Sequence, residues 1–185
     1  MKKLLILLVV ISLLYFGTKV FLNKWYKVSE TFDMEDCMVY KAILDDLNDE
    51  EMGLAVFSKT ITTALDGQSV QHVVVQHFFE IIPSGEIFCI LDFLRKNKKI
   101  SLLKDCEFLG GPYQLISQDF CSFYLRRGMK IIAPTRPGYN IKEQKVLVYL
   151  EIFTRFENDR YNDRYIVLLT KRNGRWMVQN KIIVE

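Results

Sequence analysis

The sequence has few residues of the kinds that most often carry catalysis or bind metals. His72 and His77 are its two histidines in a chain of 185 residues. No CxxC pair occurs, and there is no serine-hydrolase, zinc-protease, phosphate-loop or dinucleotide-binding motif. Because a function must be argued from a site, the sequence argues against an enzyme and predicts no catalytic, cofactor-binding or metal-ligating residue.

The acidic and cysteine-bearing segments also lack the spacing of metal sites. The acidic run at 45–51 has neither the alternating acids nor the glycine of a calcium loop. The cysteines lie in apolar surroundings without the paired spacing of zinc ligands. Buried free thiols are the favoured interpretation, and one or two disulfides of undetermined pairing are the alternative. The four residues concerned are Cys37, Cys89, Cys106 and Cys121.

The excess of basic residues is confined to the N-terminus. Residues 1–28 hold five lysines and no acidic residue, so the remainder has 25 − 5 = 20 basic residues against 22 acidic ones. No patch of lysine and arginine interleaved with aromatic residues follows. The sequence therefore argues against nucleic acid as a partner.

A long apolar run predicts a membrane anchor in residues 1–27. Residues 4–22 are nineteen residues with one charge, Lys19. At 1.5 Å per residue they form about 28 Å of helix, close to the thickness of the bilayer hydrocarbon. Trp25 and Tyr26 follow between two lysines, as is typical of a membrane interface. We expect one transmembrane helix, with the lipid bilayer as its partner.

A cleaved signal peptide is the alternative to this anchor, and it would leave a secreted protein. Lys2 and Lys3 precede the apolar run as in such peptides, but the best cleavage site, after Gly17, has the bulky Tyr15 at its −3 position. Lysines flank both ends of the run, so the sequence leaves the orientation open. The lysines before the run favour a C-terminal domain outside the cytoplasm.

After a connector at 28–33, residues 34–185 predict one α+β domain with helices packed on a mostly antiparallel sheet. Asp33 can cap a helix over 34–47 with one apolar face. Strands are expected over 54–62 and 70–80, joined at Asp66-Gly67. The second strand would place its two histidines on opposite faces, which argues against a shared site.

Further elements are predicted in the middle of the chain. A helix beginning at Ser84 would bury one face, a short strand is expected over 113–116, and Ser117 would cap another helix. The predicted buried positions of the first of these helices are Ile87, Ile90, Leu91 and Leu94.

The C-terminal third predicts a three-stranded antiparallel meander over 145–154, 164–171 and 175–184. The first strand is apolar on both faces, which indicates a central place under helices. Alternation on the last strand predicts one shared buried face. Its members are Trp176, Val178, Ile182 and Val184.

A tetrapeptide repeat, NDRYNDRY, lies at 158–165 between the first two of these strands. Asparagine and aspartate are turn formers, so we expect 157–163 to reverse the chain. A second hypothesis takes the connection 155–164 as an adhesive tip, because loops often carry function.

Several C-terminal segments resemble a group of exported bacterial proteins of unknown function. The segment RPGYN at 136–140 resembles their RxGFN-like turn, and VLVY at 146–149 resembles their ALVY-like strand. The segments RYIVLL and KRNGRWMV, from residues 164 and 171, resemble their YYVLL strand and NGxWxV hairpin. The resemblance covers roughly residues 86–185 and implies an exported domain without implying an activity.

Together these patterns favour a non-catalytic binding domain held at a bacterial membrane, with an envelope protein as a possible partner. The alternative is a small-ligand-binding or hydrolytic domain with a pocket between helices and sheet. Polar contacts in such a pocket would come from Arg136, Tyr139, Tyr149 and Arg164.

Overall fold

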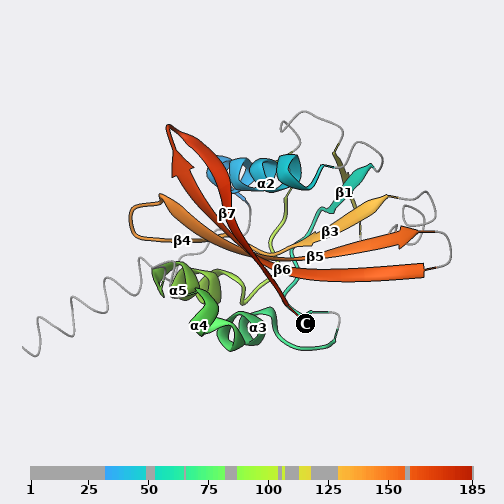
Figure 1. Ribbon diagram of the computed structural model, residues 1–185, viewed down its shortest axis with the longest axis horizontal. Helices are drawn as coiled ribbons and strands as arrows, with labels where there is room; N and C mark the ends of the chain where they lie inside the picture. Colours follow the sequence, from blue (N-terminus) through green and yellow to red (C-terminus); the bar gives the residue numbers. More distant parts are fainter. Residues whose placement is uncertain are drawn as a thin grey trace, which may run out of the picture.

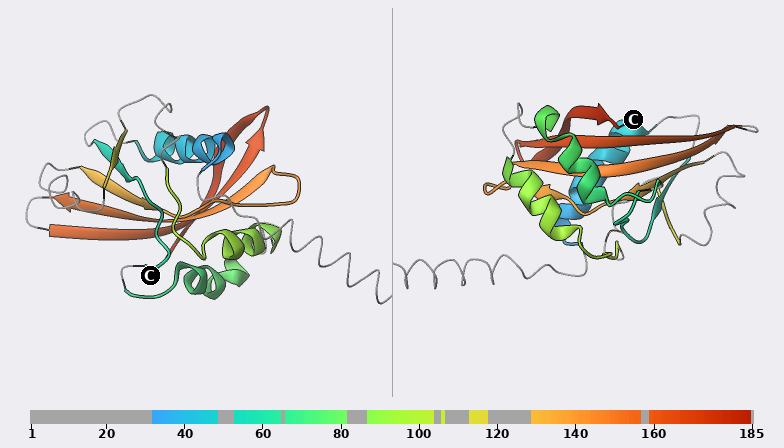
Figure 2. Two further views of the ribbon diagram at one scale, coloured as in Figure 1. Left: turned by 180° about the vertical axis from the view of Figure 1, so that it is seen from behind. Right: turned by 90° about the horizontal axis from the view of Figure 1, so that it is seen from below.

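A computed structural model describes residues 32–48, 53–64, 66–81, 87–103, 106, 113–117, 129–156 and 159–184. These residues form a mixed α+β structure around a seven-stranded sheet. Helix α2 (Met34–Leu47) covers one face, and α3 (Val70–Gln76), α4 (Phe78–Ile81) and α5 (Ile87–Lys96) cover the other (Figure 1). In the right-hand view of Figure 2, α3, α4 and α5 lie in front of the strands.

The sheet is mostly antiparallel, as predicted. Its order is β2-β1-β3-β5-β6-β7, with β4 also paired to β5. β1 runs parallel to both β2 and β3, and the remaining neighbours are antiparallel. The strands are β1 (Leu54–Phe57), β2 (Gln114–Ile116), β3 (Lys130–Pro134), β4 (Gly138–Tyr139), β5 (Lys145–Phe156), β6 (Asp159–Arg172) and β7 (Arg175–Ile183).

Helix α2 begins and buries its side chains as the sequence predicts. The Asp33 side chain accepts a hydrogen bond from the Asp36 amide, and the Asp36 side chain accepts one from the Asp33 amide. This reciprocal arrangement satisfies amides that the first helical turn leaves without partners. Cys37, Tyr40 and Leu44 are buried on one face.

Strand β5 is the centre of the structure, and it supplies side chains to two cores. Val146, Val148 and Leu150 pack in the core that includes α2. Leu147 and Tyr149 pack in the core beneath α3 and α5. Alternate residues of a strand point to opposite faces, so an apolar residue at every position is what a double-sided core requires. The predicted central place of this strand is confirmed.

The NDRYNDRY repeat is mostly strand, so the predicted reversal over 157–163 is too long. β6 pairs with β5 from Asp159 onward, with Tyr161 opposite Thr154 and Tyr165 opposite Leu150. A repeat of four keeps strand parity, so the repeated tetrapeptide fits an extended chain. Residues 157 and 158 lie outside the described residues. Most of the hypothetical tip at 155–164 is therefore paired backbone.

The last strand does not present one continuous buried face, contrary to the prediction. Leu168 is opposite Asn180 and Leu169 is opposite Val178, which leaves Gln179 as an extra residue in β7. One inserted residue reverses the facing of the side chains beyond it. Trp176 therefore packs on the α2 side and Ile182 on the α3 and α5 side.

The predicted strand at 70–80 is wrong, because α3 and α4 occupy these residues. Val70, Val73 and Val74 are buried at helical spacing, and tertiary burial outweighs the strand preference of valine. His77 ends α3, and its Nδ1 lies 2.8 Å from Glu80 Oε1. The strand before them is also shorter than predicted, since β1 ends at Phe57.

Helix α5 is confirmed, and its predicted buried face is right in part, since Ile90 is buried and Leu94 is partly buried against the core. Cys89, Ile90 and Phe93 are buried, whereas Ile87 and Leu91 are exposed. Apolar residues occur around most of this helix, so periodicity alone does not select the face that packs. The short strand expected at 113–116 is confirmed by β2, while the helix expected after Ser117 lies outside the described residues.

Two further expectations concern the membrane and the cysteines. No helix in the described ranges is long and apolar enough to span a bilayer, and the predicted span at 4–22 lies outside them. The favoured expectation of free thiols is wrong for Cys37 and Cys106, which are joined by a disulfide. Cys89 is buried with its thiol donating to the Lys145 carbonyl oxygen, and Cys121 lies outside the described residues.

Gly138 is the position where β4 meets α5 most closely. A Cβ added there would lie 2.5 Å from the Phe93 amide nitrogen and closer still to the Cys89 carbonyl oxygen. Backbone atoms cannot yield as a flexible side chain can. We expect Gly138→Ala to lower the free energy of unfolding by about 3 kcal/mol, the upper part of the usual range for overpacking.

Thermal unfolding of the detergent-solubilised full chain measures this effect, and Gly53→Ala is the matched control. An added Cβ at Gly53 would meet the flexible end of Met129. Equal stability of the two variants would contradict the close approach at Gly138.

Candidate functional site

A buried ionic cluster joins the first turn of α2 to the segment after β3. The Asp36 side chain is fully buried, and Arg136 is 3% exposed. Arg136 Nη2 donates to Asp36 Oδ2 over 3.2 Å, and the Tyr139 hydroxyl donates to Asp36 Oδ1 over 3.0 Å. These residues are separated by about 100 positions in sequence, so no local pattern announces the pairing.

Burial dominates the electrostatics of this cluster. Loss of solvent raises the pKa of Asp36, and the nearby Asp33 raises it further. Lys96, Arg136 and the Tyr139 hydrogen bond oppose this shift without cancelling it. Burial and the neighbouring Asp36 carboxylate raise the pKa of Tyr139, which therefore remains a phenol that donates to Asp36.

Helix α5 attaches to the same segment through its last turns. Asp92 accepts hydrogen bonds from the Tyr139 amide over 2.9 Å and from Arg95, and Lys96 Nζ lies 3.0 Å from it. Asn97 donates to the Arg136 carbonyl over 2.8 Å and accepts from the Arg136 amide over 2.6 Å. Arg136 and Tyr139 are thus held by both helical layers.

Glu35 extends the cluster to the β6–β7 hairpin. Trp176 Nε1 and Lys171 Nζ both contact Glu35 Oε1, while the rings of Trp176 and Tyr139 are 5.9 Å apart. The polar groups of this region form one connected network of hydrogen bonds, ion pairs and ring contacts. Such a network fixes elements in place and shields the Asp36 carboxylate from solvent. This arrangement suits a structural role better than a catalytic one.

The four residues of the predicted pocket fall into two separate groups. Arg136 and Tyr139 belong to the Asp36 cluster, whereas the Tyr149 hydroxyl donates to Glu151 over 2.8 Å. Glu151 faces Arg164 across β5 and β6, and Arg164 pairs with Asp66. The structure therefore does not bring these four side chains together around one substrate.

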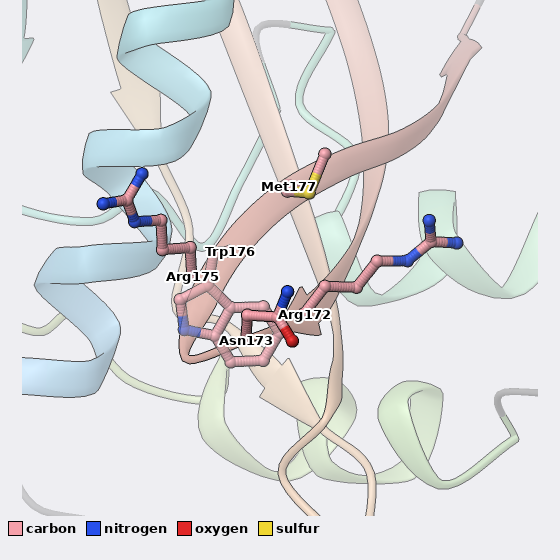
Figure 3. A pocket seen from close by; sticks show the side chains of 5 residues that line it. All are labelled: Arg172, Asn173, Arg175, Trp176 and Met177. Carbon is pink, nitrogen blue, oxygen red and sulfur yellow. The ribbon is translucent and has the colours of Figure 1, made fainter.

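An open hollow lies at the tip of β6 and β7, with a volume of about 640 Å³. We call its lining the hairpin surface: Arg172, Asn173, Arg175, Trp176 and Met177. In Figure 3 the two arginines point in opposite directions from the hairpin. Charges that diverge suit contact with a broad surface, whereas capture of one small anion needs charges that converge. The sequence showed the Asn173-Gly174 turn without showing this surface.

Within the described part of the chain, no group of three or more histidine, cysteine, aspartate or glutamate side chains is placed to hold a metal ion. Comparison with protein-family models, curated proteins and solved structures gives no match to this chain.

The Asp36–Arg136 pair should dominate the stability of this region. In Arg136→Met the carboxylate stays buried without its guanidinium partner, so we expect a loss of about 3–5 kcal/mol in the free energy of unfolding at neutral pH. Adding Asp36→Asn to this variant should restore part of the loss, because the uncompensated charge is then removed.

The sign of the pH dependence follows from the raised pKa of Asp36. In the wild type, the folded state binds the Asp36 proton more tightly than the unfolded state, so this group's contribution to stability falls as pH rises through its folded pKa. The deficit of Arg136→Met should shrink as pH falls toward that value, because loss of the guanidinium raises the pKa of Asp36 further and the variant takes up the proton first. Denaturant unfolding at a series of pH values measures both, and a constant deficit would contradict the burial of an ionised Asp36.

Proposed function

We propose that this chain is a single-pass, membrane-anchored bacterial envelope protein whose α+β domain lies outside the cytoplasm and binds another envelope protein. The N-terminal apolar run supplies the anchor, and the domain follows after the connector at 28–33. The observation that carries the proposal is the disulfide between Cys37 and Cys106.

The disulfide favours an oxidising compartment. Its two residues are buried, and the bond joins α2 to a position 69 residues further along the chain. Disulfides persist in the periplasm and outside cells, whereas the cytoplasm keeps most thiols reduced. This supports export of the domain, which the lysines around the apolar run left undecided.

The hairpin surface supports binding to a protein. Arginine and methionine are enriched in protein interfaces, and Arg172, Arg175 and Met177 are exposed on this surface. The hairpin is held firmly, because Lys171 and Trp176 are both bound to Glu35 of α2. Figure 1 places its tip beside α2, across the sheet from α3 to α5. The arginines suit a partner with an acidic segment.

The ionic cluster supports a binding role over catalysis. The Asp36 carboxylate and the Arg136 guanidinium are buried and paired, and the partly buried Tyr139 phenol donates to the same carboxylate. A substrate would have to displace contacts that hold the two helical layers. The pocket alternative loses its main support, since its four expected residues lie in two separate groups. A non-catalytic binding domain is the function that the geometry supports best.

The state of the cysteines in intact cells provides a first test. After the cells are acid-quenched and the protein is denatured, we expect Cys37 and Cys106 to resist a thiol-reactive polyethylene glycol until a reductant is added, with a gel shift reporting each modified thiol. The variant Cys37→Ser/Cys106→Ser should lose about 4 kcal/mol of stability, the entropic value for a loop of this length. Reduced thiols at both positions in cells would argue for a cytoplasmic domain.

Charge reversal on the hairpin provides a second test. Cross-linking in membranes, followed by mass spectrometry, should identify a partner protein. In Arg172→Glu/Arg175→Glu we expect the yield of this cross-link to fall at least about tenfold, which corresponds to a loss of about 1.4 kcal/mol in binding free energy. Lys142→Glu is the control, because Lys142 is an exposed cation outside the hairpin surface. Equal yields would exclude the hairpin surface, and the absence of any partner would count against the binding function itself.

A further inference from the structure

The helical layer formed by α3, α4 and α5 exposes large apolar side chains on its outer side. We call this set the outer helical face: Val75, Phe79, Ile87, Phe88 and Leu91. Phe79 is 83% exposed, and the other four are between 43% and 47% exposed. Single exposed apolar residues are ordinary on proteins, but a group on one layer indicates a contact surface.

The geometry of the helices directs these side chains away from the sheet. On α5 the buried positions are Cys89, Ile90 and Phe93, which pack in the core beneath the layer. At about 100° per residue, the centre of the exposed positions lies roughly 160° around the helix from the centre of these buried ones. The same construction on α3 places Val75 roughly 150° from its buried valines. The outer helical face thus points outward.

Positive charge accompanies this apolar face. The described residues between 70 and 99 carry four basic side chains, and two of them, Arg95 and Lys96, are partly buried and paired with Asp92. Lys98 and Lys99 are exposed directly after α5. Apolar side chains beside lysines are typical of helices that lie in the interface of a membrane with anionic lipids.

The path of the chain brings this face close to the predicted anchor. From Leu22, where the predicted span ends, to Phe32 there are ten residue steps, which reach at most about 35 Å. Phe32 contacts the Arg136 guanidinium, with 5.7 Å from its ring centroid to the guanidinium carbon. The Arg136 backbone is bound to Asn97 at the end of α5. The chain therefore enters the domain next to the lysines after α5.

We propose that the outer helical face lies on the lipid bilayer, with Phe79, Phe88 and Leu91 in the interfacial region and Lys98 and Lys99 near anionic headgroups. This inference rests on the proposed membrane anchor. A short tether keeps the domain at a high effective concentration near the surface, so even a weak interfacial affinity suffices. In this orientation the hairpin surface, on the opposite side of the sheet, faces away from the membrane (Figure 1).

Site-directed photo-cross-linking of the full chain tests the proposal. A benzophenone amino acid replaces Phe79, and the protein is reconstituted in vesicles of phosphatidylethanolamine and phosphatidylglycerol. Mass spectrometry then identifies what the probe has captured. We expect lipid adducts at position 79 and none from the same probe in place of Met177, an exposed apolar residue of the hairpin surface.

Adducts at position 79 with a second copy of the chain, or with residues 4–22, would overturn the lipid contact in favour of those occupants. Equal lipid capture at positions 79 and 177 would also overturn it, because the domain would then have no preferred orientation. Flotation of the chain with the vesicles reports the anchor separately. A chain that floats without lipid adducts at position 79 refutes this inference alone, and one that does not float refutes the proposed anchor too.

Discussion

The burial of the Asp36 carboxylate is the constraint on which the rest of the structure depends. A buried charge is tolerated only when it is paired and hydrogen-bonded, and here its partners come from the segment that follows β3. That segment is held in turn by the end of α5, and the neighbouring Glu35 binds the β6–β7 hairpin. One turn of α2 therefore positions elements from both helical layers and from the sheet.

Double-sided burial of β5 explains why the two faces of the domain can differ in role. Among the described residues, α2 packs on one face of the sheet and α3 and α5 pack on the other. The two candidate contact surfaces lie outside these layers: the hairpin surface beside α2, and the outer helical face of α3 to α5. Their placement on opposite sides of the sheet suits a domain that contacts a membrane on one side and a protein on the other.

The sequence predicted those elements in which local preference and burial agree. The meander, the short strand β2 and the capped helix α2 follow from residues close together in the chain. The valines of α3 have a strand preference that burial in the core overrides. The extra residue at Gln179 reverses the side-chain directions in the rest of β7, and no local pattern in the sequence indicates it. The buried face of α5 was predicted only in part, since its apolar residues extend beyond the side that packs.

For this protein the sequence by itself determined the α+β class, the central strand and the apolar N-terminal run, because each depends on composition or on a period of two or 3.6 residues. Tertiary structure alone decided which residues form the candidate site. Asp36 meets Arg136 and Tyr139, and Cys37 meets Cys106, across long separations in the chain. No periodic pattern encodes such pairings, because the packing of α2, α5 and the sheet brings these side chains together.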